Sequence, residues 1–90
     1  MLLAHYAPNA KVELCNSFAE AEERRNQLTT DGVPVQILHH EDMVTYALSL
    51  YDDLRAADIN GIEVVLAVLP PDEGLGTAIR DRLSKASASN

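Results

Sequence analysis

The feature that most constrains the fold of this 90-residue chain is an almost continuous apolar run, Ile62 to Leu69, that ends in two prolines. Aliphatic and β-branched residues without polar alternation are typical of a strand covered on both faces in a parallel sheet. Pro70 and Pro71 donate no backbone N–H and hold φ at about −65°, so the strand has to end there. The sequence therefore predicts a buried strand whose carboxyl end turns sharply.

The segment that follows the prolines, Asp72 to Gly76, has the residues of a helix start. Its acidic pair can accept hydrogen bonds from free N–H groups and meets the positive end of a helix dipole. Gly74 and Gly76 let the backbone approach another backbone or a ligand closely. Apolar residues then recur at helical spacing, so an amphipathic helix is predicted to close the chain. They are Leu75, Ala78, Ile79 and Leu83.

Upstream, residues 10–15 and 33–37 alternate apolar and polar side chains, which predicts two half-covered strands. Between them, Ser17 and Glu20 have the spacing of a capping box that opens a helix, and Asp31-Gly32 closes it. Asp42 can cap a second, longer helix that stops at residues 58–61. The stripe of that helix predicted to pack on the sheet consists of Val44, Ala47, Leu48, Tyr51 and Leu54.

The resulting order, β-α-β-α-β-α with short connections, predicts an α/β fold. It is a small three-layer domain with a parallel sheet of about three strands and helices on both faces. Residues 1–9 have no helical or strand period and are predicted to be a linker arm, and residues 10–90 the domain itself.

Composition argues against several classes of function. The net charge of −7 and the pI near 4.7 disfavour contact with nucleic-acid phosphates, so no direct nucleic-acid partner is expected. Cys15 is the single cysteine, which excludes an intramolecular disulfide and a Cys-rich zinc site. No apolar run reaches the roughly 20 residues of a membrane span, and no signal peptide is recognisable at the start of the chain. A cytoplasmic protein without a membrane partner is predicted.

No catalytic residues can be assigned, because no nucleophile or base has an evident orienting partner. The run His39-His40-Glu41-Asp42 raises the hypothesis of a metal site. Adjacent side chains point in different directions, however, and no His pair at i,i+4 or third ligand cluster accompanies them, so no metal is predicted. The position of a dinucleotide-binding glycine motif, directly after the first strand, holds Asn16-Ser17-Phe18 instead.

Three segments of the chain resemble one known family. The strand that ends in prolines, followed by Glu-Gly-Leu-Gly, Ala-Ile, Asp-Arg-Leu and Lys-Ala, is similar to the close of the long form of threonylcarbamoyl-AMP synthase. The letters of Met1 and His5 to Pro8 resemble the linker that leads into the C-terminal accessory domain of that family. The series from Tyr46 to Asp58 resembles a helix of the same domain.

The resemblance implies a function and a strand order. In the family, an N-terminal domain condenses threonine, bicarbonate and ATP for the threonylcarbamoyladenosine modification of tRNA. The C-terminal domain and its linker cap or regulate that active site. This chain would then need a catalytic domain as its partner, in cis or in trans. ATP and Mg would bind to that catalytic domain, and this chain would bind no cofactor. The apolar run alone would place the third strand centrally. The Rossmann-like fold of the family implies the order 2-1-3 with the first strand central, and 2-1-3 is the order predicted here.

The candidate contact residues follow from the same resemblance. His5, Tyr6 and Pro8 are the expected linker contacts with the catalytic domain. Glu73, Gly74 and Gly76 form a turn that could contact that domain or a ligand. Asp81 and Arg82 are candidates for a polar contact between domains, with a purely structural role on the helix as the alternative.

A second hypothesis is a stand-alone domain that binds a small ligand without catalysis. It would use the crevice at the carboxyl ends of the strands, near Asn16, His39 and residues 70–76. A catalytic domain encoded next to this chain, or a synthase that co-purifies with it, would favour the accessory function.

Overall fold

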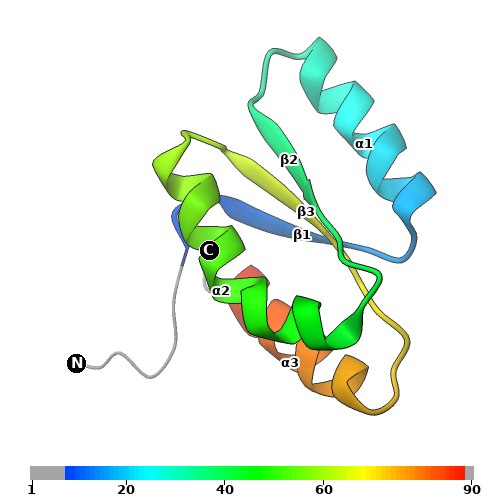
Figure 1. Cartoon of the computed structure of the whole chain (residues 1–90). Helices are drawn as coiled ribbons and strands as arrows, with labels where there is room; N and C mark the ends of the chain where they lie inside the picture. Colours follow the sequence, from blue (N-terminus) through cyan, green and yellow to red (C-terminus); the bar gives the residue numbers. More distant parts are fainter. Residues whose placement is uncertain (1–7, 89–90) are drawn as a thin grey trace.

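The computed structural model describes residues 8–88 and confirms the predicted α/β class (Figure 1). Strands and helices alternate along the chain, as the periodicity of the sequence indicates. In chain order they are β1 (Lys11–Cys15), α1 (Phe18–Thr30), β2 (Val35–Leu38), α2 (Met43–Ile59), β3 (Val64–Val68) and α3 (Leu75–Ala88).

The three strands form one parallel sheet in the order β1-β3-β2. The predicted order 2-1-3 is therefore wrong, since β3 and not β1 is central. The physical reason lies in the side chains. All five residues of β3 are buried, whereas β1 and β2 include half-buried and exposed positions. A strand that pairs on both edges and is covered on both faces needs the continuous apolar run that only β3 has.

Two helical layers cover the sheet, as predicted. Figure 1 shows α1 on one side of the sheet and α2 with α3 on the other. Alternate residues of β3 divide between the two cores, because successive side chains of a strand point to opposite faces. Leu66 packs with Ala21 and Leu28 of α1, whereas Val65 and Ala67 pack with residues of α2 and α3.

The rotation of α2 differs from the prediction. Its buried stripe consists of Tyr46, Leu50, Leu54 and Ala57, whereas Val44 and Leu48, which were predicted to pack on the sheet, are exposed. The helix has more apolar positions than one face can bury, so its periodicity alone leaves its rotation open. The hydroxyl of Tyr46 fixes the rotation, because it hydrogen-bonds to the sheet.

Side-chain caps begin the first two helices, as the sequence indicates. Ser17 Oγ accepts a hydrogen bond from the backbone N–H of Glu20 at 3.1 Å. The N–H of Asn16, one residue before the cap, donates to Glu20 Oε1 at 3.3 Å, so the return bond of the predicted capping box comes from Asn16 and not from Ser17. Asp42 Oδ2 accepts from the N–H of Thr45 at 2.9 Å and caps α2.

The first described residues are bound to the end of α2. The backbone N–H groups of Asn9 and Ala10 donate to the two carboxylate oxygens of Asp58, at 3.1 Å and 2.9 Å. Pro8 and Ala10 are buried there. The chain thus enters the domain beside the carboxyl-terminal end of α2. The boundary between arm and domain after residue 9 stays a prediction. Between residues 8 and 88, no helix has both the length and the apolar character needed to cross a membrane.

Candidate functional site

A pocket of about 200 Å³ lies at the carboxyl ends of β2 and β3, the edge where parallel α/β sheets commonly bind ligands. Two loops and the start of α2 form its walls. The lining residues are His39, His40, Glu41, Met43, Tyr46, Val68, Leu69, Pro70 and Pro71. His39 and the prolines thus lie where the crevice hypothesis placed them, but Asn16 and residues 72–76 do not line this pocket.

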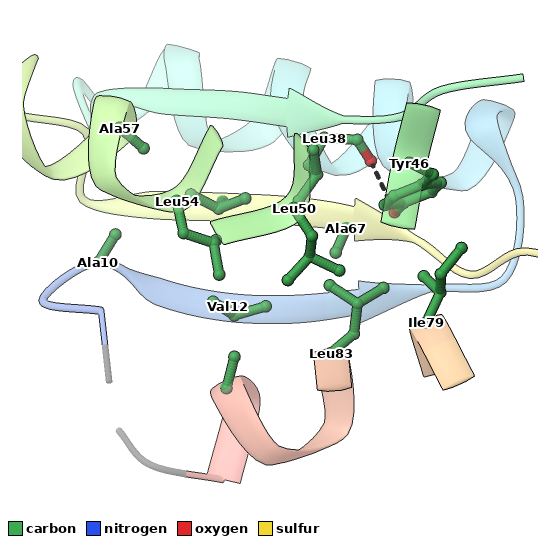
Figure 2. Close-up of a cluster of buried hydrophobic side chains, with 12 residues drawn as sticks. Ala10, Val12, Leu38, Tyr46, Leu50, Leu54, Ala57, Ala67, Ile79 and Leu83 are labelled. Carbon is green, nitrogen blue, oxygen red and sulfur yellow. Dashed lines mark hydrogen bonds between the residues drawn. The ribbon is translucent and has the colours of Figure 1, made fainter. Parts of the chain in front are cut away.

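Tyr46 joins the pocket to the sheet. Its hydroxyl donates a hydrogen bond to the carbonyl oxygen of Val68 at 2.8 Å. It also lies 3.4 Å from the carbonyl oxygen of Leu38 (Figure 2). These two carbonyls belong to the last residues of β3 and β2. Burial raises the pKa of Tyr46, and the nearby Asp53 carboxylate adds to the shift. The phenol therefore stays neutral and acts as a structural donor between α2 and the strand ends.

The two adjacent histidines point toward different helices. The ring of His39 lies 5.2 Å from that of Phe18 in α1. His40 Nε2 lies 2.7 Å from Asp53 Oδ2 in α2, and its ring meets the ring of Tyr46 edge-on at 5.4 Å. Across residues 8–88, no three His, Cys, Asp or Glu side chains lie close enough together to hold a metal ion.

Sequence reasoning missed the pair of His40 and Asp53. A usable signal was present, because Asp53 lies seven residues after Tyr46 on α2 and therefore beside the buried stripe. A carboxylate at such a half-buried position commonly has a partner. The partner itself comes from the loop after β2, and sequence spacing could not identify it.

The predicted turn contact, Glu73 to Gly76, is a tightly packed backbone structure. Gly74 has a positive φ of 56°, and the N–H of Gly76 donates to the carbonyl of Glu73 at 2.9 Å. A Cβ atom at Gly76 would lie only 1.9 Å from the carbonyl oxygen of Pro71. Gly76 is therefore required by the close approach of two backbone segments, as the sequence indicates. Glu73 is exposed.

The other predicted contact residues are distributed over the molecule. Asp81 pairs with Lys85 at 3.0 Å on the exposed side of α3. Arg82 is exposed, and its side chain makes no ion pair or hydrogen bond with any residue of the described range. Pro8 is buried at the amino end of the sheet, opposite to the turn at 73–76, and His5 and Tyr6 lie outside the described residues. Pro8 and the turn therefore do not form one site.

Within residues 8–88, four of the seven Lys and Arg side chains pair with acidic side chains. Arg24 binds both oxygens of Glu13, at 2.9 Å and 3.1 Å, and this hydrogen bond is the main reason that the pKa of Glu13 is lowered. Three further cations are paired with acidic neighbours on their own helices: Arg25 with Glu22, Arg55 with Asp52, and Lys85 with Asp81. A triphosphate needs several converging cations or N–H groups, so these residues do not fit ATP and Mg.

Cys15, the single cysteine of the sequence, is a further candidate nucleophile. Its side chain is buried in the α1 core, and burial raises the pKa of the thiol. The reactive thiolate is therefore scarce at neutral pH, and Cys15 behaves as a small apolar core residue.

We expect Tyr46→Phe to lower the free energy of unfolding by about 1–2 kcal/mol, because a buried carbonyl at the strand end loses its donor. Urea denaturation at pH 7 measures the loss, and Tyr51→Phe on the same helix is the control. The folded state disfavours ionisation of Tyr46, so the wild type also loses stability once the pH exceeds about 10, the unfolded pKa of tyrosine. The phenylalanine variant lacks this contribution. Equal denaturation midpoints for both variants would contradict the proposed role of the hydroxyl.

Fold and site define a small three-layer α/β module whose described residues provide a pocket and a packed turn but no catalytic set. The chain belongs to the family described as threonylcarbamoyl-AMP synthase, C-terminal domain, whose model matches residues 1–88. The predicted family is thereby confirmed.

Individual relatives agree with this assignment. The chain is 31% identical over 106 residues to threonylcarbamoyl-AMP synthase of Bacillus subtilis (strain 168), which covers 97% of this chain and 31% of that protein. The chain thus spans less than a third of the length of this relative.

Two solved structures show how the domain occurs elsewhere. In the structure of P. abyssi Sua5 complexed with L-threonine, the match covers 94% of this chain and 30% of the Sua5 chain, with a TM-score of 0.74 and 27% identity. For the C-terminal Sua5 domain from Pyrococcus horikoshii, the match covers 87% of this chain and 93% of that domain's chain, with a TM-score of 0.67 and 26% identity.

Proposed function

We propose that this chain is an accessory and regulatory domain of threonylcarbamoyl-AMP synthase, and that it serves the threonylcarbamoyladenosine modification of tRNA. The observation that carries the proposal is the family match to the C-terminal domain over residues 1–88, combined with coverage of only 31% of the Bacillus subtilis synthase. The larger part of that relative has no counterpart in these 90 residues. The partner in this proposal is a catalytic domain, in cis or in trans.

The physical chemistry of the chain supports a role exerted on a partner. Condensation of threonine, bicarbonate and ATP requires a site that holds all three in reacting geometry and stabilises charge on the phosphates. A net charge of −7 and the pairing of Arg24, Arg25, Arg55 and Lys85 with acidic side chains are unfavourable for ATP. ATP and Mg are therefore expected on the catalytic domain, with neither a membrane nor nucleic acid as a direct partner of this chain.

The linker contacts form part of the proposal. One of the structurally similar proteins is a form of P. abyssi Sua5 in which a His and the following Tyr are both replaced by alanine. This chain contains one such adjacent pair, His5 and Tyr6. Tyr6 lies three positions before Asn9, whose backbone N–H is bound by Asp58. We propose that His5 and Tyr6, with Pro8, contact the catalytic domain, and that Glu73 in its exposed turn is a further contact.

The test is an assay of pyrophosphate release with ATP, threonine and bicarbonate. The chain is assayed alone and together with a separate catalytic domain, prepared from the Bacillus subtilis synthase without its own C-terminal domain. We expect no turnover by the chain alone and faster threonine-dependent release when it is added to the catalytic domain, because a capped site excludes water. Turnover by the chain alone, or an unchanged rate in the mixture, would contradict the accessory role.

The one observation that favours the alternative, a stand-alone ligand-binding domain, is the pocket between the loops after β2 and β3. Its size, however, argues against a small-molecule site. Its volume of about 200 Å³ is below the range of roughly 300–1,000 Å³ that is usual for small-molecule sites. The accessory function is therefore the preferred proposal. Saturable binding of a metabolite that depends on His39, in the absence of any effect on a catalytic domain, would favour the alternative.

A further inference from the structure

Four large apolar side chains lie exposed on α2 and α3: Val44, Leu48 and Leu75 in the first two turns of these helices, and Ile59 at the carboxyl end of α2. Val44 and Leu48 are one turn apart on α2, and Leu48 is 78% exposed. Leu75 opens α3 and is 46% exposed. Single exposed apolar residues are common, but a group on adjacent elements is typical of an interaction surface. We call Val44, Leu48 and Leu75 the α2–α3 face.

The helix α2 presents Val44 on the flank that faces α3, and Leu48, one turn further, on the outer face beside that flank. Val44, Tyr51 and Asp58 follow one another at intervals of seven residues and therefore share one flank of α2. Asp58 on this flank binds Ala10 at the entry to β1, the strand that α3 covers. The opposite flank carries Asp53, which binds His40.

The helix α3 presents Leu75 on the side that faces α2. Ser87 donates to the carbonyl oxygen of Val12 at 2.8 Å, and Arg80 Nε donates to that of Pro70 at 2.7 Å. These two residues, seven apart, mark the flank of α3 directed away from α2. Leu75 and Arg82, also seven apart, lie on the other flank. The two helices contact each other on the same side of the sheet (Figure 1).

The entry point of the chain indicates what covers this face. In a protein that carries this module as its C-terminal domain, the preceding part joins it through Pro8 and Asn9, which lie at the end of α2 beside Asp58. Asp58 is 14 residues from Val44, about 21 Å along a helix. A domain attached at this point is therefore tethered at the other end of α2, about 21 Å from Val44, and can reach the α2–α3 face along the exposed side of the helix.

We propose that the α2–α3 face is the docking surface for the catalytic domain of threonylcarbamoyl-AMP synthase, an inference that rests on the function proposed above. The partner surface has to present an apolar centre that buries Leu48, Val44 and Leu75. It also has to present a carboxylate at the rim for Arg82, which has no acidic partner within residues 8–88, whereas the neighbouring Asp81 is paired with Lys85.

The test is calorimetric titration of the chain with the separate catalytic domain of the Bacillus subtilis synthase. We expect Leu48→Ser and Leu75→Ser each to weaken binding by about tenfold, because truncation of a central apolar contact is costly. Phe18→Ser is the matched control, since Phe18 is 42% exposed on α1, on the opposite side of the sheet. It should bind like the wild type. Thermal melts of the three variants verify that each is folded.

The possible outcomes separate the two proposals. If the wild type does not bind and does not change the rate of the catalytic domain, the accessory function fails and this inference fails with it. If the wild type binds and Leu48→Ser and Leu75→Ser bind equally well, only the docking surface is overturned. If sedimentation shows a dimer of the chain that Leu48→Ser dissociates, the face pairs two copies, which also overturns the inference.

Discussion

A Gly76→Ala variant is expected to melt more than about 10 °C below the wild type, because 1 kcal/mol shifts the melting temperature of a domain this small by about 4–8 °C. The added Cβ would lie 1.9 Å from the carbonyl oxygen of Pro71, a backbone atom that cannot rotate away. Such overpacking costs about 3 kcal/mol, the upper end of the usual range. Thermal denaturation followed by circular dichroism measures the effect.

Gly74→Ala is the control for this prediction, since Gly74 lies two residues away in the same turn. A Cβ atom at Gly74 has open space around it, but the φ of 56° is unfavourable for alanine. The expected cost is therefore only the conformational penalty of about 1–2 kcal/mol. A loss of stability in Gly76→Ala that is no greater than in Gly74→Ala would show that the close approach of Pro71 is absent.

The second large effect is expected for Leu66→Ala in the central strand, with a loss of about 3 kcal/mol in the free energy of unfolding. Leu66 is fully buried in β3, between β1 and β2 and beneath α1. Leu14 in the edge strand β1 is only partly buried, so Leu14→Ala should cost about 1 kcal/mol, below the usual core value. Urea denaturation of both variants makes the comparison. A larger loss for Leu14→Ala would contradict the central position of β3.

Local elements could be predicted well from this sequence because their signals are local. The capping box of Ser17 and Glu20, the cap at Asp42 and the strand that ends at the prolines all depend on residues close together in the chain. Strand order depends on which surfaces are covered. The apolar run of β3 indicated the correct central strand, and the order that the family resemblance implied did not.

The rotation of α2 and the pocket were harder to predict, since both depend on contacts between distant segments. Val44 and Leu48 have the spacing of core residues, but the hydrogen bond of Tyr46 to the end of β3 directs another stripe inward. The pair of His40 and Asp53 is likewise set by the loop after β2. The wrong prediction for Val44 and Leu48 is informative, because apolar residues that the domain does not bury itself are available to a partner.

A domain replacement tests whether this chain serves a synthase as its C-terminal domain. The C-terminal domain of the Bacillus subtilis synthase is exchanged for this chain, and synthesis of threonylcarbamoyl-AMP is compared among the replaced, truncated and native proteins. We predict that the replaced protein is clearly more active than the truncated one and that Gly76→Ala within it abolishes the gain. Activity of the replaced protein equal to that of the truncated one, with this chain folded, would contradict that role.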